Sequence, residues 1–427
     1  MITAVIVGAG HRALLYASLA KLNPEKLKIV GVADPIRQRR KMVAEAYGFS
    51  EEFCFDSAEE LAAHGKIADA AINGTMDNQH VDTTIPLLNA GYDVLLEKPF
   101  AISREEVRRL AETINRIGRK VMICHVLRYA PFYTEIKQRV IDGEIGEIIN
   151  IQSAEHVSYH HVASGYIRGK WRRKDMCGSS SLMAKCCHDL DLLSWYKSGV
   201  APAKVSSFGG LHYFCREHAP VNSGEYCLLD CPLEKDCLYS ARKHYLDHPD
   251  RWSFYVWAGL EHLSSPSLKQ KEAFLKNKLN PYARCVWKLD NDVADRQSVM
   301  IEFKDGSTAT HNMICGTSRP MRKLHIIGTT GELHGILDEN KYVIRHIDPR
   351  PGHEYKETEC DLNNEGDTTG AFGGHGGGDL RLAMDFVALA EGQKPSISCT
   401  SVMDSLNGHL IGFAADQAME ENKIIKL

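Results

Sequence analysis

Short apolar runs alternate with helical patterns through the first 125 residues of the chain. The runs occupy residues 2–7, 29–33, 70–72, 94–96 and 121–124. Runs this short and this uniformly apolar are typical of strands buried on both faces of a parallel sheet. Between them, capping-box patterns begin helices at Ser57 and Ser103, and Gly91 and Gly118 close helical runs. The alternation predicts right-handed crossovers and a doubly wound parallel sheet, a Rossmann domain, in residues 1–125.

The pattern changes after residue 125, where apolar and polar residues alternate as in half-buried strands. The β-rich segments are residues 148–152, 299–303, 308–311, 323–327, 332–336 and 342–346. Helical patterns lie near residues 190–196, 380–390 and 405–420. Residues 126–427 are therefore predicted to form an α+β domain with a large, mostly antiparallel sheet. Within it, residues 212–290 show little regular pattern, which indicates an insertion.

Composition narrows the class of protein. The chain has 427 residues, 44% hydrophobic and 25% charged, which is enough apolar material for more than one core. Lys and Arg number 51 against 55 Asp and Glu, and this balance argues against a nucleic-acid partner or a polybasic membrane protein. No apolar run approaches the roughly 18 residues of a membrane span. Met1 leads directly into an apolar run instead of a signal peptide, and 13 Cys are too sparse for a disulfide scaffold, so we expect a cytoplasmic protein.

The first predicted strand runs into a glycine-rich turn, Gly8-Ala9-Gly10-His11-Arg12-Ala13, and a helical pattern follows. This is the GxGxxG/A arrangement of dinucleotide-binding folds in its strand–turn–helix context. Gly8 permits the tight turn, Gly10 lets the backbone approach a pyrophosphate, and the small Ala13 lets the helix pack on the strand. The helix N-terminus offers N–H groups to the phosphates. The alternative is a glycine turn that binds nothing.

An acidic residue follows the second predicted strand. Asp34 lies 24 residues after Gly10, where a carboxylate accepts hydrogen bonds from the adenosine ribose hydroxyls and repels a 2′-phosphate. We therefore expect NAD as the cofactor. Three nearby arginines, Arg37, Arg39 and Arg40, leave NADP open, because a guanidinium can accommodate that phosphate.

The predicted strand at residues 94–96 ends in Glu97-Lys98-Pro99. In a doubly wound sheet, ligands bind outside the carboxyl ends of the strands, so Lys98 is expected to project toward the nicotinamide end of the crevice. There its side chain could share or receive the proton of a substrate hydroxyl. A surface lysine in a turn is the alternative that spacing alone leaves open.

Five motifs together resemble the Gfo/Idh/MocA family, named for glucose–fructose oxidoreductase and inositol dehydrogenase. They are the glycine turn; Thr75 with His80; Glu97-Lys98-Pro99; the segments 128–131 and 143–147; and Cys187-His188-Asp189-Leu190-Asp191. The resemblance implies a Rossmann domain and an α/β domain whose open sheet mediates homodimers or homotetramers. It also implies oxidation of a sugar or polyol hydroxyl with NAD(P). Contacts to the cofactor are then expected from His11, Arg12, Thr75, His80, Glu97, Lys98 and Arg172.

In the family, the lysine of the Glu-Lys-Pro motif and a histidine of the second domain form an acid–base pair. These residues match Lys98 and His188 of this chain. Imidazole suits the role, because hydride leaves a carbinol carbon only as its hydroxyl loses a proton. A structural histidine is the alternative for His188.

The chain departs from the family at one position that bears on the reaction. Many family dehydrogenases carry an aspartate four residues before the catalytic histidine, where this chain has Ala184 followed by Lys185. Either Lys185, Asp189 or Asp191 takes over its role, or the proton chemistry differs. Two alternatives to a dehydrogenase therefore stay open. One is an NAD-dependent glycosidase of the same family, which uses transient oxidation and elimination, and the other is a catalytically silent dinucleotide-binding sensor.

A histidine-rich segment, residues 155–161, lies just before the His188 motif. The resemblance places substrate-facing residues here, and imidazole groups suit the vicinal hydroxyls of a polyol. The candidates for substrate binding are His156, His160, Lys185 and, in the glycine-rich stretch 373–378, His375. A polar strand edge and a flexible connector are the respective alternatives.

Four cysteines cluster in the predicted insertion, at Cys215, Cys227, Cys231 and Cys237. Four thiolates could hold a structural zinc ion that stabilises a segment too small to bury its own core. The spacing is not a doubled CxxC, so buried free thiols are the alternative. Any metal here would be structural, because the dinucleotide chemistry needs none.

Overall fold

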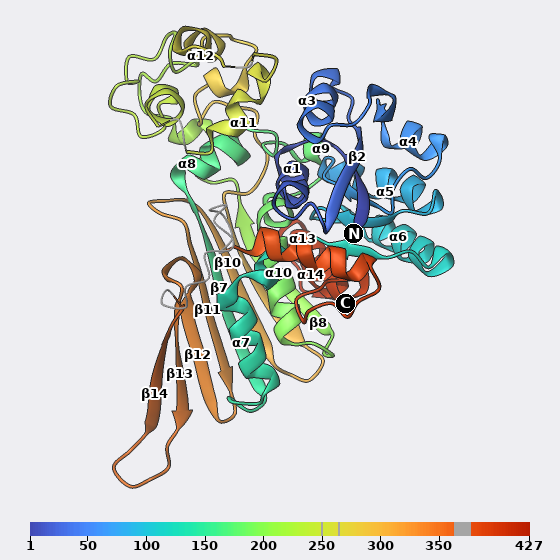
Figure 1. Ribbon diagram of the computed structural model, residues 1–427. Helices are drawn as coiled ribbons and strands as arrows, with labels where there is room; N and C mark the ends of the chain where they lie inside the picture. Colours follow the sequence, from blue (N-terminus) through green and yellow to red (C-terminus); the bar gives the residue numbers. More distant parts are fainter. Residues whose placement is uncertain (249–250, 264, 363–376) are drawn as a thin grey trace.

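Two β-sheets organise the molecule (Figure 1). The computed structural model describes residues 1–248, 251–263, 265–362 and 377–427. A six-stranded parallel sheet is formed by the N-terminal part of the chain, and a nine-stranded, mostly antiparallel sheet by the remainder. Both sheets were predicted from the sequence, and both are confirmed.

The first sheet is parallel and has the strand order β3-β2-β1-β4-β5-β6. Its strands are β1 (Ile2–Val7), β2 (Leu27–Ala33), β3 (Cys54–Phe55), β4 (Ala70–Asn73), β5 (Asp93–Leu96) and β6 (Val121–Ile123). The helices between them are α1 (His11–Ala17), α2 (Leu19–Leu22), α3 (Arg37–Tyr47), α4 (Ala58–His64), α5 (His80–Asn89) and α6 (Arg104–Ile117). The strand order reverses between β1 and β4, so the crevice outside their carboxyl ends is where a doubly wound sheet binds its ligand.

The second sheet has the order β14-β13-β12-β11-β7-β10-β9-β8-β15. Its strands are β7 (Ile148–Ser158), β8 (Pro202–Gly210), β9 (Arg296–Phe303), β10 (Thr308–Thr317), β11 (Met321–Gly328), β12 (Gly331–Ile336), β13 (Lys341–Ile347), β14 (Tyr355–Asp361) and β15 (Ile425–Lys426). Neighbouring strands are antiparallel except β7 and β10, which run parallel. This parallel pair brings the histidine-rich end of β7 beside the end of β10.

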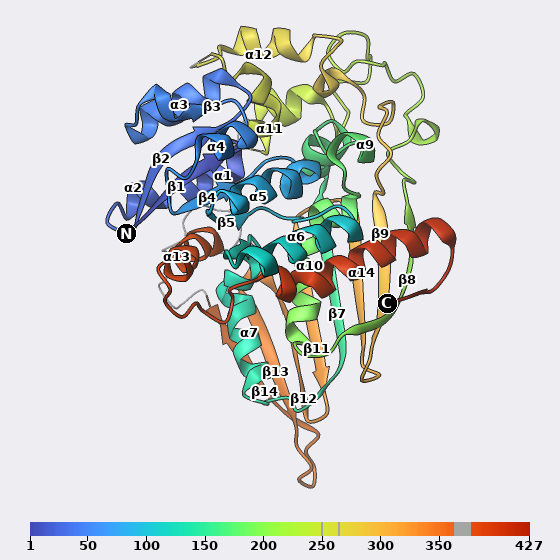
Figure 2. The same ribbon diagram turned by 90° about the vertical axis from the view of Figure 1, so that its right-hand side faces the viewer.

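Helices cover one face of the second sheet (Figure 1). They are α7 (Pro131–Ile141), α10 (Ser181–Tyr196) and α14 (Val402–Glu421), and α10 and α14 pack side by side (Figure 2). Val299 and Ile301 of β9 are buried on this face, whereas Met300 between them points the other way and is 59% exposed. Strict alternation of this kind is typical of a sheet with one face in the core and one face open.

The first sheet also receives a helix from the far end of the chain. Leu382 and Phe386 of α13 (Gly378–Ala390) are buried in the same apolar core as Ile6 of β1 and Ile72 of β4. The predicted boundary at residue 125 lies just after β6, but α13 returns across it. The Rossmann core is therefore completed by a segment that begins more than 250 residues after the predicted boundary.

The predicted insertion lies beside the Rossmann domain, beyond one end of the second sheet (Figure 1). It contains α11 (Ser253–Trp257) and α12 (Leu268–Leu275), and α8 (Tyr159–Val162) and α9 (Lys174–Cys177) precede it in sequence. Tyr245, Val256 and Leu275 belong to a small apolar core of its own. Among the described residues, no helix is both long enough and apolar enough to cross a lipid bilayer.

The contribution of α13 to the first core can be measured directly. We expect Phe386→Ala to lower the free energy of unfolding by about 3–5 kcal/mol, because it opens a cavity between α13 and the first sheet. Met384 on the same helix is 46% exposed, so Met384→Ala is the matched control and should cost less than about 1 kcal/mol. Urea denaturation followed by circular dichroism measures both. Equal losses in the two variants would contradict this packing.

Candidate functional site

The glycine turn packs against the loop that follows β4. Gly8 has φ +74°, and a Cβ at this position would lie 2.8 Å from the backbone nitrogen of Thr75. A Cβ on Gly74 would in turn lie 2.9 Å from the Cβ of Ala13. Larger residues would push α1 away from the sheet. Gly10 is the extended N-cap residue of α1, and no side chain caps that helix end, so its backbone N–H groups are available to a phosphate.

Asp34 is buried at the end of β2, next to this turn. Its Oδ2 accepts a hydrogen bond of 2.8 Å from the backbone N–H of Ala9, and its Oδ1 accepts one of 2.8 Å from that of Ile36. These bonds hold the carboxylate in place and aim it along the glycine turn. A carboxylate in this position fits the ribose hydroxyls of an adenine dinucleotide.

Arg12 and Glu97, both predicted to contact the cofactor, bind each other. Arg12 Nε donates to Glu97 Oε1 over 2.9 Å, and Arg12 Nη2 lies 2.7 Å from Asp379 Oδ1 of α13. Tyr16 donates to the same Glu97 oxygen over 2.8 Å and also contacts Arg12. The backbone N–H of Lys98 donates to Glu97 Oε2 over 2.8 Å. This network joins α1, the end of β5 and α13, so it positions the glycine turn relative to Lys98.

Thr75 and His80 belong to a second set of bonds behind the crevice. The two ring nitrogens of His80 lie 2.7 Å from the carbonyl oxygen of Pro99 and 3.2 Å from that of Thr75. Thr75 Oγ1 donates to Asn73 Oδ1 over 2.9 Å. His80 therefore ties the loop after β4 to the loop that carries Lys98. Both ring nitrogens of His80 contact backbone carbonyl oxygens, one in each of these two loops.

Lys98 and the His188 helix meet at the carboxyl edge of the first sheet. Lys98 Nζ donates a hydrogen bond of 2.8 Å to the carbonyl oxygen of Ala184 on α10. His188 follows one turn later on the same helix, is 4% exposed, and packs edge-on against His125, which follows β6, with ring centroids 5.7 Å apart. Lys98 of the first domain therefore contacts α10 of the second domain one helical turn before His188. His125 was not singled out in the sequence, since nothing local distinguishes it.

Comparison with known proteins identifies the family. Two family models match the chain: an oxidoreductase family's NAD-binding Rossmann fold over residues 2–125, and its C-terminal alpha/beta domain over residues 137–234. Together these ranges cover more than half of the chain. The chain belongs to the Gfo/Idh/MocA family of oxidoreductases. The resemblance drawn from its motifs is confirmed.

Named relatives and solved structures agree with this assignment. YteT of Bacillus subtilis, named as an oxidoreductase, is 26% identical over 344 residues, 78% of this chain and 75% of that protein. The NAD⁺-dependent scyllo-inositol 2-dehydrogenase of the same species is 30% identical over 144 residues, 34% of this chain and 41% of that enzyme. The fold of scyllo-inositol dehydrogenase from Lactobacillus casei, solved with NAD(H) and scyllo-inositol, matches with a TM-score of 0.65 at 17% identity, over 100% of this chain and 99% of that one.

The three residues predicted to replace the family's aspartate, Lys185, Asp189 and Asp191, each pair with another charged side chain. Asp191 forms a buried two-pronged ion pair with Arg128, with both hydrogen bonds 2.7 Å long. Lys185 Nζ lies 2.9 Å from Glu155 Oε1 on β7. Asp189 is paired with Arg322 as described below. At the aspartate position itself, the backbone carbonyl oxygen of Ala184 accepts the hydrogen bond from Lys98 Nζ, and the alanine side chain adds no carboxylate.

Lys185 and Asp189 belong to a buried cluster of four charges between α10 and the second sheet. Arg322 Nε of β11 lies 2.8 Å from Glu155 Oε2 and 3.1 Å from Asp189 Oδ1. Burial raises the pKa of Glu155, and the two cations, Arg322 and Lys185, oppose that rise. Two cations and two carboxylates balance each other, so Lys185, predicted as a substrate ligand, takes part in a buried cluster that joins α10 to β7 and β11.

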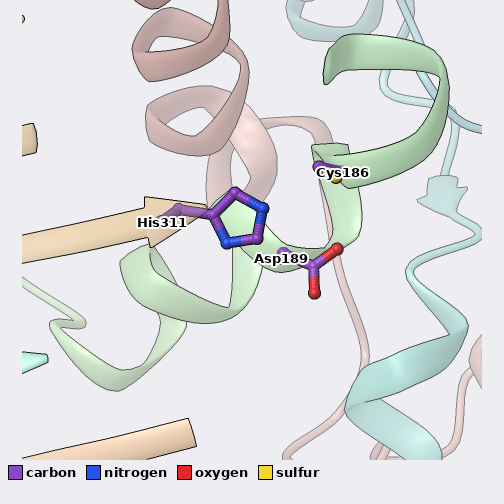
Figure 3. Close-up of side chains that lie close together, drawn as sticks. All are labelled: Cys186, Asp189 and His311. Atoms are coloured by element: carbon purple, nitrogen blue, oxygen red, sulfur yellow. The ribbon is translucent and has the colours of Figure 1, made fainter. Parts of the chain in front are cut away.

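Cys186, Asp189 and His311 come close together beside that cluster (Figure 3). Their sulfur, oxygen and nitrogen atoms all lie within 4.8 Å of one another, and all three residues are buried. Such a set could ligate a divalent cation by distance alone. Burial raises the pKa of the Cys186 thiol well above its usual value, however, and Asp189 is already neutralised by Arg322. The set is better described as a polar contact that joins α10 to β10.

The predicted zinc ligands do not assemble. Within the described residues, no three of the sulfur atoms of Cys215, Cys227, Cys231 and Cys237 lie within 4.8 Å of one another. Cys227 Sγ instead accepts a hydrogen bond of 3.1 Å from the buried Arg168, and Cys215 Sγ lies 3.3 Å from His218 Nδ1. The described part of the insertion has its own apolar core, and the hydrogen bonds of the buried Arg168 tie it to residues 227, 239 and 284.

The other predicted substrate ligands lie in different environments. His156 lies between the buried Glu155 and Val157 on β7, and β-alternation therefore places it on the open face of the sheet, away from α10. His160 is half-buried at α8, close to the charges of Arg251 and His248 of the insertion, and its pKa is lowered, first by burial. Arg172 Nε lies 3.3 Å from Asp290 Oδ1. His375 lies outside the described residues.

Aromatic residues of the insertion reach the crevice, which sequence reasoning missed. Trp252 stacks on the buried His161 with ring centroids 3.7 Å apart, and Phe254 stacks on His11 of the glycine turn at 4.4 Å. Tyr255 packs edge-on against Trp171. The only local signal was the dense aromatic run 252–257. One wall of the site in this family member is therefore built by the insertion.

The Glu97 network predicts a specific dependence of stability on pH. Burial alone would raise the pKa of Glu97, but Arg12 and Lys98 outweigh burial and lower it from 4.5 to about 2. Because the folded pKa lies below the unfolded value, the stabilisation is complete above pH 4.5 and is lost as the pH falls toward 2. We expect the wild type to exceed Glu97→Gln by about 3 kcal/mol in unfolding free energy near neutral pH, with the gap closing below pH 4.5.

Chemical denaturation at a series of pH values measures this gap. Glu52→Gln, which changes an exposed carboxylate, is the control and should show no pH-dependent gap. A gap between wild type and Glu97→Gln that stays constant down to pH 3 or so would contradict the assigned network.

Proposed function

We propose that the protein is an NAD-dependent dehydrogenase that oxidises a secondary hydroxyl of a sugar, glycoside or cyclitol. The observation that carries this proposal is the bond from Lys98 Nζ to the Ala184 carbonyl, which sets the lysine one helical turn from His188 at the edge of a dinucleotide-binding sheet. The names of relatives support the substrate class: two inositol dehydrogenases are among them, and a solved neighbour holds NAD(H) with scyllo-inositol.

Each residue has a definite role in this proposal. Lys98, anchored by one N–H to Ala184, has its remaining N–H groups available to donate to the substrate hydroxyl oxygen. His188 accepts the hydroxyl proton as the carbon–oxygen double bond forms. The C–H bond breaks with its electron pair, and bound NAD⁺ supplies the acceptor for that hydride. The dinucleotide would be held by Gly8, Gly10 and Asp34. The glycine turn and Lys98 would be kept in position relative to each other by Arg12, Glu97 and His80.

The neutral acceptor at Ala184 favours this role for Lys98. The backbone carbonyl oxygen of Ala184 carries no net charge, so it orients the ammonium without neutralising it, and the positive charge can act on the substrate oxygen. As the hydroxyl loses its proton, negative charge develops next to the lysine, and stabilisation of that charge lowers the barrier.

Nicotinamide reduction with a panel of sugars and cyclitols tests the proposal. We expect Lys98→Ala and His188→Asn each to lower kcat by about 10²- to 10⁴-fold, because each removes a group that acts on the hydroxyl proton. NAD affinity, measured by calorimetry, should change by only a few-fold, and the exposed control Lys28→Ala should leave both quantities unchanged.

Cleavage of a chromogenic glycoside without net nicotinamide reduction would favour the glycosidase alternative. Full activity of Lys98→Ala would refute the assigned chemistry.

We further propose that the open face of the second sheet forms a homo-oligomer interface. Phe208, Met300 and Ile314, on the adjacent strands β8, β9 and β10, share this face and are 75%, 59% and 41% exposed. A cluster of exposed apolar side chains on a sheet face is typical of a surface that another subunit covers.

The interface can be tested with a single charge. In Met300→Glu, association would bury an unpaired carboxylate, so we expect the oligomer to dissociate into folded monomers in sedimentation velocity runs. Met403→Glu, at an exposed position of α14, is the control and should leave the sedimentation coefficient unchanged. A wild type that sediments as a monomer at high concentration would refute the interface.

A further inference from the structure

Two contacts join the described part of the insertion to the Rossmann domain, one at the glycine turn and one beside Asp34, where the ribose of the predicted cofactor would lie. Phe254 stacks on His11 in the glycine turn, with ring centroids 4.4 Å apart and an angle of 18° between the planes. Glu261 accepts hydrogen bonds of 3.0 and 3.2 Å from Arg39 Nε at the start of α3. The two contacts come from one segment, residues 251–263, which lies outside the ranges that match the family models.

Arg39 is one of the arginines that left the choice between NAD and NADP open in the sequence. Its Nη1 lies 3.8 Å from Asp34 Oδ2, so it borders the position where a ribose hydroxyl would meet Asp34. The neighbouring Arg40 donates a hydrogen bond of 2.6 Å to the backbone carbonyl of Asp34 and pairs with Asp56. The two arginines that flank Asp34 are therefore both held by carboxylates.

We propose that Glu261 is a coenzyme-specificity residue, which the insertion contributes to exclude a 2′-phosphate. A 2′-phosphate binds where an arginine can turn toward it. Here Arg39 lies between two carboxylates, Asp34 and Glu261, and both side chains of the Arg39–Glu261 pair are less than one-third exposed. A doubly charged phosphate would have to displace Glu261 and would still face Asp34. This inference rests on the proposed NAD-dependent function and adds the residue that enforces the choice of coenzyme.

Burial makes the pair effective. The Arg39 and Glu261 side chains are 27% and 28% exposed, so water and salt screen their attraction less than that of a surface pair. The stack of Phe254 on His11 holds the same segment against the glycine turn, which limits how far Glu261 can move away from Arg39. A 2′-hydroxyl needs no such movement, because its acceptor, Asp34, is already in place.

Calorimetric titration with NAD⁺ and with NADP⁺ tests the proposal without any need for a substrate. We expect the wild type to bind NAD⁺ and to bind NADP⁺ much more weakly. Glu261→Gln should tighten NADP⁺ binding by about tenfold or more, because it frees the Arg39 guanidinium and removes a repelling charge, while NAD⁺ affinity changes by less than about threefold. Adding Arg39→Ala to Glu261→Gln should abolish that gain.

The matched control is Glu272→Gln, which removes a carboxylate that pairs with Arg242 and Lys276 in the same insertion. It should leave both affinities at the wild-type values. If Glu261→Gln gives the same NADP⁺ affinity as Glu272→Gln while NAD⁺ still binds, the specificity role of Glu261 is wrong and the proposed function stands. If the folded wild type binds neither nucleotide, the proposed function fails together with this inference.

Discussion

One buried carboxylate, that of Glu97, holds three distant segments of the chain in a single arrangement. It receives hydrogen bonds from Arg12 and Tyr16 of the first helix and from the backbone of Lys98, and Arg12 continues the network to Asp379. A buried charge without partners is costly, so each segment must stay where its donor reaches Glu97. The glycine turn, Lys98 and α13 are therefore held in fixed positions relative to one another.

Local patterns were sufficient for most of the fold. The apolar run at 94–96 became β5 (Asp93–Leu96), and the helical pattern at 380–390 became α13 (Gly378–Ala390), since periodicity reports burial directly. The two-residue strand β3 was missed because it is too short to show a period. The packing partner of α13 and the parallel pairing of β7 with β10 were also out of reach, because both depend on contacts between segments far apart in sequence.

The candidate site divides in the same way. The glycine turn, Asp34 and Lys98 were predicted from motifs whose chemistry is local to a strand end, and His188 from the resemblance to the family. His156 was expected at the substrate, but one step of β-alternation separates it from Glu155 and places it on the open face. The cysteine spacing suggested zinc, yet Arg168, which no motif marks, satisfies Cys227. Sequence spacing predicts which residues share a face of one helix or strand. Which residues of two different elements come together depends on the side chains that pack between those elements.

Ala184 replaces the expected aspartate in a part of the structure where the neighbouring charges already balance one another. Between α10 and the second sheet, the carboxylates of Glu155 and Asp189 balance the cations of Lys185 and Arg322. The carboxylate of Asp191 balances Arg128. Among the described residues, no carboxylate lies within ion-pair distance of Lys98 Nζ. The lysine is nevertheless close enough to Glu97 to lower the pKa of that carboxyl group. The backbone carbonyl oxygen of Ala184 holds Lys98 against α10, and in the proposed reaction the positive charge of the lysine would act on the hydroxyl oxygen that loses its proton.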